Sequence, residues 1–327
     1  MKKILQQLFE YKTLSREAAE KAMVNIANGM YSDAEIASFI TVYLMRSITI
    51  EELQGFKDAL LQLASPINLG DEPLMDIVGT GGDGKNTFNI STLSCFIVAG
   101  TGNKVAKHGN YGATSVSGSS NVMEQLGYQF SNKEEQLRDE LNKANICFLH
   151  APLFHPALKV VAGIRKSLAV RTFFNMLGPM VNPAKPAYQL VGVYNLEMAR
   201  IYNYMLQQGN SQFTIIHSLD GYDEISLTGD TKIINNKGEK MMSAEALGKR
   251  VVLASDIYGG HTVEEAASIF TKIIKGEGTW AQNAVVLANA AMGLYSTGKY
   301  DAYETCYQMA VESLESGKAY KSLQQLI

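Results

Sequence analysis

The spacing of apolar side chains predicts helices in the first part of the chain. Over residues 3–64 apolar positions recur three and four residues apart, which predicts helices that each bury one stripe. The stretches that begin at Ser32 and Thr49 both fit the S/T-x-x-E capping box, which satisfies two orphan N–H groups at a helix start. Glycine and proline are sparse here, so we predict a small helical domain over residues 1–68.

From about residue 70 short apolar runs alternate with helical patterns. Strands separated by helices indicate βαβ units and a mostly parallel sheet. The runs that predict strands are residues 75–78, 104–107, 146–149, 190–193, 213–217 and 251–254. Three helices are predicted near the C-terminus, at about 262–275, 281–296 and 300–316. The predicted fold class is therefore α/β, with a small helical N-terminal domain and a larger α/β domain whose mostly parallel central sheet has flanking helices.

The proline distribution suggests how the two domains connect. Residues 171–187 hold three of the seven prolines, and we predict that a segment at about 168–187 crosses between the domains. The α/β domain would then comprise residues 69–167 and 188–327. In such sheets ligands bind beyond the carboxyl ends of the strands, which directs attention to the turns that follow the predicted strands.

Composition and charge narrow the class of protein. The chain has 327 residues, 46% of them apolar and 19% charged, which is typical of a well-buried globule. Its net charge of −3 provides no basic field for nucleic acid or a membrane surface, and no apolar run approaches a membrane span. Three scattered cysteines and an N-terminus unlike a signal peptide predict a cytoplasmic protein without a disulfide framework or a zinc site.

Residues 76–92, DIVGTGGDGKNTFNIST, read as a strand that ends in a glycine-rich turn, and three phosphate-binding interpretations compete. The glycines match the dinucleotide pattern GxGxxG, but residues 84–123 contain no acidic residue for the ribose hydroxyls. They also match part of a Walker A loop, but Asn86 stands where a magnesium-binding Ser or Thr belongs. Both patterns are therefore incomplete.

The third interpretation uses the acid-free stretch itself. Donor-rich turns occur in it at residues 89–92, 107–110 and 117–119, with Asn121 predicted to cap the helix that follows the last of them. Backbone N–H groups at glycine turns and helix N-termini bind anions, and hydroxyls, amides and lysines add donors. Such turns can also be plain βα connections. Three in succession favour a large, multiply charged anion such as a pyrophosphate on a sugar.

Together these motifs resemble anthranilate phosphoribosyltransferase in order and spacing over nearly the whole chain. The matching segments are GTGGD (79–83), NIST (89–92), KHGN (107–110), SGS (117–119), HPALK (155–159), IRKSLAVRT (164–172), NMLGPMVNP (175–183) and DEISLTG (223–229). The resemblance implies transfer of a phosphoribosyl group from phosphoribosyl pyrophosphate to the amine of anthranilate in tryptophan biosynthesis. It also implies a magnesium cofactor, a hinge-cleft active site and a homodimer.

The resemblance also assigns site residues, position by position. Substrate binding falls to Gly79, Gly82, Asp83, Thr87, Asn89, Ile90, Ser91, Thr92, Lys107, His108, Gly109, Asn110, Ser115, Ser119 and Arg165. Magnesium would be held by Ser91, Asp223 and Glu224. Catalytic roles fall to His155, Asn110 and Arg165, with Gly79 also lining the anthranilate site. Arg165 suits a carboxylate because of its forked geometry, whereas His155 could either accept a proton or cap a helix.

The sequence departs from the family pattern at three positions. Tyr111 follows KHGN where the family often has Arg, Val116 stands where a basic residue is common, and Asn121 replaces an Asp. Two alternatives stay open: a pyrimidine nucleoside phosphorylase, which shares the KHG and SGS turns, and a non-catalytic nucleic-acid-binding paralogue. The first would not need the Asp223–Glu224 pair, and the second would require a basic surface.

Overall fold

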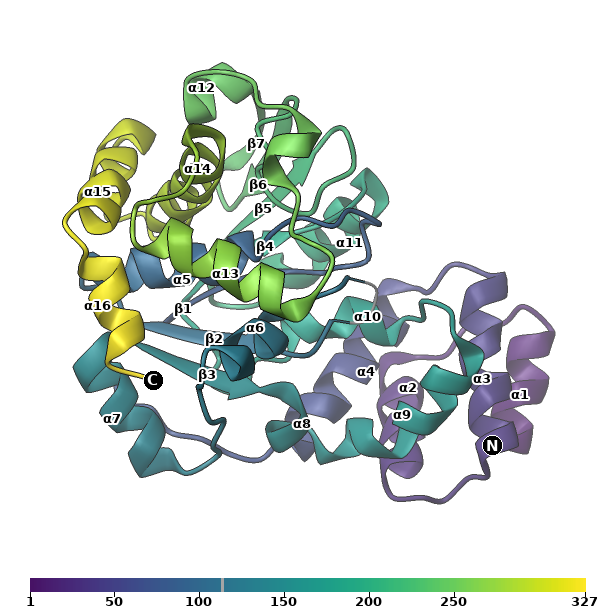
Figure 1. The fold of residues 1–327 in the computed structure, drawn as a ribbon. Coiled ribbons are helices and arrows are strands. Elements are labelled where there is room, and N and C mark those ends of the chain that lie inside the picture. Colours follow the sequence, from purple (N-terminus) through teal and green to yellow (C-terminus); the bar gives the residue numbers. More distant parts are fainter. Residues whose placement is uncertain (113–114) are drawn as a thin grey trace. The chain divides into compact units, whose positions relative to one another are not determined.

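The computed structural model describes residues 1–112 and 115–327, and its internal contacts divide these into two compact units. The helical unit comprises Met1–Ile67 and Ala151–Lys185, and the sheet unit comprises Asn68–His150 and Pro186–Ile327 (Figure 1). Residues 151–167, which the sequence analysis grouped with the α/β domain, thus pack with the N-terminal helices. The reason is that their helix α9 (Pro156–Leu168) packs against helices α2, α3 and α4.

The helical unit is built from short helices and one 3-10 turn. Its elements are α1 (Lys2–Phe9), α2 (Arg16–Ala27), α3 (Asp33–Met45), α4 (Ile50–Leu63), α8 (Ala151–Phe154), α9, α10 (Phe174–Leu177) and η1 (Gly178–Met180). Both predicted capping boxes are confirmed, at Ser32 before α3 and at Thr49 before α4. Aromatic rings fill the interior, where Phe173 stacks on Phe56 at a centroid distance of 4.7 Å.

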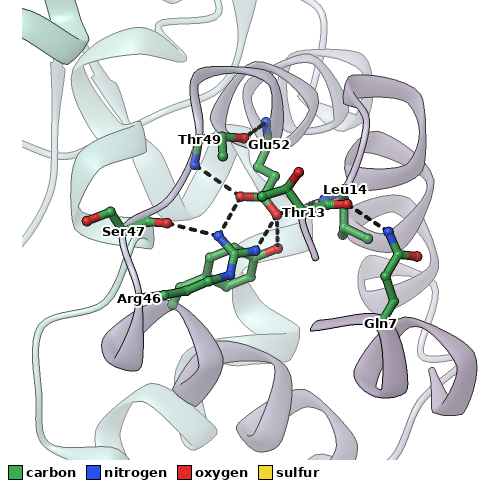
Figure 2. A network of polar contacts seen from close by, with 8 residues as sticks. Gln7, Thr13, Leu14, Arg46, Ser47, Thr49 and Glu52 are labelled. Atoms are coloured by element: carbon green, nitrogen blue, oxygen red, sulfur yellow. Dashed lines mark hydrogen bonds and ion pairs between the residues drawn. The ribbon is translucent and has the colours of Figure 1, made fainter. Parts of the chain in front are cut away.

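A buried ion pair connects α3 and α4 inside the helical unit (Figure 2). Glu52 is fully buried, and its carboxylate accepts hydrogen bonds from the Arg46 guanidinium and from the backbone N–H groups of Leu14 and Thr49. Burial acts to raise the pKa of Glu52, but these hydrogen bonds outweigh it and hold the pKa below its ordinary value. The network therefore fixes the start of α4 against two other segments.

The sheet unit has seven strands in the order β3-β2-β1-β4-β5-β6-β7. They are β1 (Met75–Gly79), β2 (Val105–Gly109), β3 (Ile146–His150), β4 (Tyr188–Gly192), β5 (Gln212–Ser218), β6 (Thr231–Asn235) and β7 (Gly238–Met242). The first five are parallel, and β6 and β7 are antiparallel. The predicted fold class is thus confirmed, including the small helical domain.

Helices cover the sheet and form the remaining core. They are α5 (Ile90–Gly100), α6 (Ser119–Gln125), α7 (Glu134–Ala144), α11 (Leu196–Gln207), α12 (Ala244–Gly248), η2 (Ala254–Ile257), α13 (Val263–Ile274), α14 (Trp280–Ser296), α15 (Tyr303–Glu315) and α16 (Lys318–Gln324). Helix α5 packs on β1 and β2, α14 packs on β4 and β5, and the two helices contact each other (Figure 1). None of the helices in the described ranges is long and apolar enough to cross a membrane.

The structure differs from the predicted elements at the edge of the sheet. Residues 251–254 were predicted to be a strand, but they form a loop that enters η2, with Val251 and Leu253 exposed. The hairpin of β6 and β7 was missed because β7, GEKMM, is exposed at almost every position and has no apolar alternation. Helix α16 was missed as well, since it is only two turns long.

Candidate active site

The centre of the sheet has the topology that creates ligand sites. From β1 the chain proceeds to β2 on one side, and from β4 it proceeds to β5 on the other, so the β1–β4 pair is where the strand order reverses. Open parallel sheets bind ligands at this switch point, beyond the carboxyl ends of the strands. Both strands end here in glycine, with Gly79 paired directly to Gly192.

The two paired glycines allow Asp223 to lie over this point. A Cβ on Gly79 would lie 2.3 Å from Asp223 Oδ2, and one on Gly192 would lie 1.5 Å from the Asp223 carbonyl oxygen. Neither distance is possible for a real side chain. Two glycines from different strands are therefore required for one carboxylate to reach the switch point.

A glycine loop, residues 80–89, connects β1 to α5. Gly81, Gly82 and Gly84 all have positive φ, at 63°, 78° and 74°. In this conformation the Gly81 N–H donates to Asp223 Oδ2 at 2.6 Å. The Asp83 carboxylate accepts from the N–H of Lys85 at 2.9 Å. The loop thus offers backbone donors beside two carboxylates.

Glu224 lies at the N-terminus of α5. Its carboxylate accepts from the Ser91 N–H at 3.0 Å and from the Thr87 hydroxyl at 3.5 Å. The positive end of a helix stabilises such a charge. The predicted metal ligands Ser91, Asp223 and Glu224 are therefore brought to one place, although the acidic pair comes from a loop more than a hundred residues later in the chain.

The three carboxylates perturb one another. Burial raises the pKa of Asp223 to about 7, and the charge of Asp83 acts in the same direction. Burial also raises the pKa of Glu224 and of Asp83. Within residues 1–112 and 115–327, no group of three or more His, Cys, Asp or Glu side chains has the arrangement of a protein-only metal cage. The raised pKa values show that nearby lysines do not offset the burial of these carboxylates. A few carboxylate oxygens fit magnesium, which keeps several waters and binds through few carboxylates.

The turn after β2 lies next to the glycine loop. Asn89 Nδ2 donates to the Ser117 carbonyl at 3.0 Å, which joins two of the predicted donor-rich turns. Ser119 Oγ donates to the carbonyl of the exposed Asn110 at 3.3 Å. Lys107 is buried and its ammonium donates to the Ile77 carbonyl at 2.7 Å, so part of its donor capacity is already used.

The other predicted binding residues differ in accessibility. Ile90 and Thr92 are buried in the first turn of α5, and His108 is buried in β2 with its N–H donating to Asp76 at 3.3 Å. Gly109 ends β2 with partial exposure, and Ser115 is exposed. For Ile90 and Thr92 only the backbone N–H groups at the helix start could face a ligand.

The position of Asn121 corrects one prediction. Helix α6 begins at Ser119, so Asn121 belongs to its first turn and is not its cap. Its side-chain oxygen accepts from the N–H groups of Gly112 and Gly118, at 2.9 and 3.0 Å. The residue thereby connects Gly112 to Gly118. An Asn performs this function as an acceptor without adding negative charge.

Tyr111 has its own anchoring contacts. Its hydroxyl donates to Glu124 Oε1 at 2.7 Å, and its ring packs edge-on against His150 at a centroid distance of 4.9 Å. Val116 is exposed and stands beside this turn. At these two positions, therefore, the sheet unit has an anchored aromatic and an exposed aliphatic side chain where the family often has cations.

Two predicted residues belong to the helical unit. His155 precedes α9 and is fully buried, and burial lowers its pKa. Arg165 is half-buried on α9, with its guanidinium 5.3 Å from the centroid of the Phe174 ring. Burial lowers its pKa too, and no carboxylate pairs with it among the residues that the structure describes. An arginine in such surroundings is suited to an external anion.

The sequence analysis missed one residue that holds the acidic pair in place. Asn289 is buried in α14, accepts from the Ile225 N–H at 3.0 Å and donates to the Ile225 carbonyl at 2.8 Å. It therefore fixes the backbone immediately after Glu224. A single amide within the otherwise apolar segment VVLANAAMGL of α14 was the available signal, since buried polar side chains need partners.

Comparisons with known proteins agree over the whole chain. Residues 71–320 match the family model described as glycosyl transferase family, a/b domain, and residues 2–64 match the helical bundle domain of the same family. Anthranilate phosphoribosyltransferase from Flavobacterium psychrophilum is 56% identical over 326 residues, which cover 100% of this chain and 98% of that protein. The Bacteroides fragilis enzyme is 54% identical, with 100% and 99% covered.

Solved structures give the same result. The crystal structure of anthranilate phosphoribosyltransferase from Thermus thermophilus superposes with a TM-score of 0.91 at 32% identity and covers 98% of this chain and 97% of its own. The Saccharomyces cerevisiae enzyme in complex with PRPP and Mg gives 0.90 at 26% identity, covering 99% and 95%. The full-length match in sequence and the shared fold together show that the chain belongs to the anthranilate phosphoribosyltransferase family of glycosyl transferases.

Proposed function

We propose that the protein binds 5-phosphoribosyl 1-pyrophosphate at the switch point of the sheet and transfers its phosphoribosyl group to the amine of anthranilate. The products are N-(5-phosphoribosyl)anthranilate and pyrophosphate, in the pathway of tryptophan biosynthesis. The observation that carries the proposal is the position of Asp223 and Glu224 against the glycine loop, where carboxylates and anion-binding N–H groups meet. A multiply charged anion with its metal needs both.

The residues around the switch point would share the binding of the diphosphate. Backbone N–H groups of the glycine loop and the start of α5 would hold phosphate oxygens, with hydroxyls from Thr87, Ser91 and Ser119. Ser91, Asp223 and Glu224 would hold magnesium, and the Saccharomyces cerevisiae relative was solved in complex with PRPP and Mg. When bound, magnesium would neutralise charge that develops on the pyrophosphate leaving group.

The acceptor substrate would be oriented by the residues that the motifs assign to it. Arg165 would bind the anthranilate carboxylate through its guanidinium fork, since it lacks a carboxylate partner in the described chain. Asn110 would orient the amine, and Gly79 would leave room for the ring. His155 would act as a neutral proton acceptor or a structural residue, because its burial disfavours the charged imidazole.

Oligomeric state and location are part of the proposal. A groove of about 480 Å³ between α1 and α3 is lined by exposed apolar side chains that include Phe9, Tyr11 and Met45. Exposed apolar surface of this kind suits an interface, and we assign it to a second copy of the chain, giving a homodimer that sedimentation would detect. Three reduced, buried cysteines suit the cytoplasm, and the net charge of −3 does not suit nucleic acid.

A product assay tests the function. Purified protein with anthranilate, phosphoribosyl pyrophosphate and magnesium should release pyrophosphate and form a phosphoribosylated aromatic amine. Phosphorolysis of thymidine is the matched control for a pyrimidine nucleoside phosphorylase. Thymidine cleavage without pyrophosphate release would refute the proposed reaction in favour of that alternative.

A further inference from the structure

A distant turn forms a short antiparallel bridge with the glycine loop. Residues 257–260, called the buttress turn here, begin at the last residue of η2 and precede α13. The Phe88 N–H donates to the Ile257 carbonyl at 3.2 Å, and the Gly259 N–H donates to the Asn86 carbonyl at 2.8 Å. Thr87 and Tyr258 form the bridge between these bonds. Residues 86–88 of the glycine loop are therefore hydrogen-bonded to the buttress turn in the manner of two antiparallel strands.

The side chain of Asn86 adds a third contact to this pairing. Its Nδ2 donates to the Gly260 carbonyl at 2.7 Å. This is the residue that stands where a Walker A loop would have its metal-binding hydroxyl. Here the amide points to the buttress turn, so it connects segments separated by 174 positions in the chain.

Gly259 is required for the close approach of the two segments. A Cβ at this position would lie 2.4 Å from the Thr87 carbonyl oxygen and 2.8 Å from the Phe88 nitrogen. Both atoms belong to the backbone, so they cannot move without moving the loop. Any side chain at position 259 would therefore push the loop away from the buttress turn.

We propose that Asn86 and Gly259 are positioning residues for the diphosphate substrate, because they fix where the donors from Thr87 to Ser91 lie. The glycine loop and the start of α5 are also held by the two carboxylates. Asp223 accepts a hydrogen bond from Gly81, and Glu224 accepts hydrogen bonds from Thr87 and Ser91. The inference rests on the proposed function, in which the same carboxylates also serve the metal. The buttress turn uses none of those oxygens, so it holds the loop independently of them.

Gly259→Ala tests the steric part, because Gly259 is not among the glycines with a left-handed backbone and alanine adds only the overlapping methyl group. Gly209→Ala in the same unit is the matched control, since its Cβ would meet only the Leu206 carbonyl at 3.5 Å. Asn86→Ala tests the side-chain contact. Each variant is assayed for the KM of each substrate, kcat and the thermal midpoint of unfolding.

We expect Gly259→Ala to raise the KM for phosphoribosyl pyrophosphate on the order of tenfold, since small displacements of positioning groups are costly. Asn86→Ala should raise it less, by about threefold to tenfold, which corresponds to the loss of one hydrogen bond. The KM for anthranilate, kcat and the unfolding midpoint should stay near those of Gly209→Ala. A role confined to stability would instead lower the midpoint and affect both substrates alike.

Hydrogen exchange in the protein without substrate or metal gives a second measurement. The amides of Phe88 and Gly259 should exchange about tenfold faster in Gly259→Ala and Asn86→Ala than in Gly209→Ala, because the bridge that protects them is weakened. Unchanged exchange, or an unchanged KM for the diphosphate, would overturn the inference. If the wild-type protein released no pyrophosphate, the proposed reaction would fail, while the exchange rates would still decide whether the bridge holds the loop.

Discussion

Gly192→Ala should inactivate the enzyme by displacing a loop that lies far from position 192 in the sequence. The new Cβ would lie 1.5 Å from the Asp223 carbonyl oxygen, whereas an ordinary contact is 3.4–4 Å. That oxygen must therefore retreat by roughly 2 Å, and the carboxylates of Asp223 and Glu224 move with it. Misplacement by about 1 Å can already cost on the order of 100-fold in rate, so a loss of at least that size is expected.

The assay is pyrophosphate release as a function of magnesium concentration, with the unfolding midpoint measured in parallel. Gly209→Ala is the control, because the added methyl group there meets only one carbonyl at 3.5 Å. The expected signature is a fall in kcat/KM for phosphoribosyl pyrophosphate and a higher magnesium requirement in a protein that still folds. A Gly192→Ala enzyme with wild-type kcat/KM and magnesium dependence would refute the reasoning, since it would mean that Asp223 need not lie over the switch point.

The remaining predictions concern charges. Combining Asp223→Asn with Glu224→Gln should abolish magnesium-dependent turnover without lowering the unfolding midpoint, and retained turnover would rule out their metal role. Arg165→Ala should raise the KM for anthranilate by about tenfold or more, as for loss of a charge-assisted pair, and an effect confined to the diphosphate would contradict the assignment. Arg46→Ala should lower the free energy of unfolding by about 3–5 kcal/mol, measured in denaturant, because it leaves Glu52 buried and unpaired. Because the pKa of Glu52 is lower in the folded than in the unfolded state, Glu52 stabilises the folded protein above its unfolded-state pKa of about 4.3. This stabilisation is lost as the pH falls through the folded-state pKa. Glu52→Gln should remove this part of the pH dependence of the free energy of unfolding.

The candidate site was predictable from sequence mainly where its residues are close together in the chain. The turns at 79–92 and 107–119 are recognisable in the sequence because they are rich in glycine and in residues with hydroxyl or amide side chains. The structure connects them through the hydrogen bond between Asn89 and Ser117. By contrast, nothing near Asn289 or Gly259 in the sequence indicates which loop each one contacts. Their partners are Ile225 and Thr87, at separations that no local pattern spans.

The local elements, the fold class and the family can all be inferred from the amino-acid sequence alone. They depend on short-range patterns, which residue propensity and periodicity reveal. Examples are the capping boxes at Ser32 and Thr49, the apolar parallel strands and the ordered motifs. These predictions failed at the exposed edge of the sheet, where β7 has no apolar face to reveal it.

Which residues contact one another depends on how the chain packs in three dimensions. Parallel pairing sets Gly79 beside Gly192, and that pairing creates the space into which Asp223 enters. Three-dimensional packing also places residues 151–167 with the N-terminal helices, because α9 buries its apolar face there. The physical reason is that register and close approach depend on how distant segments pack, and this packing is settled by the shape of the whole core rather than by any one segment.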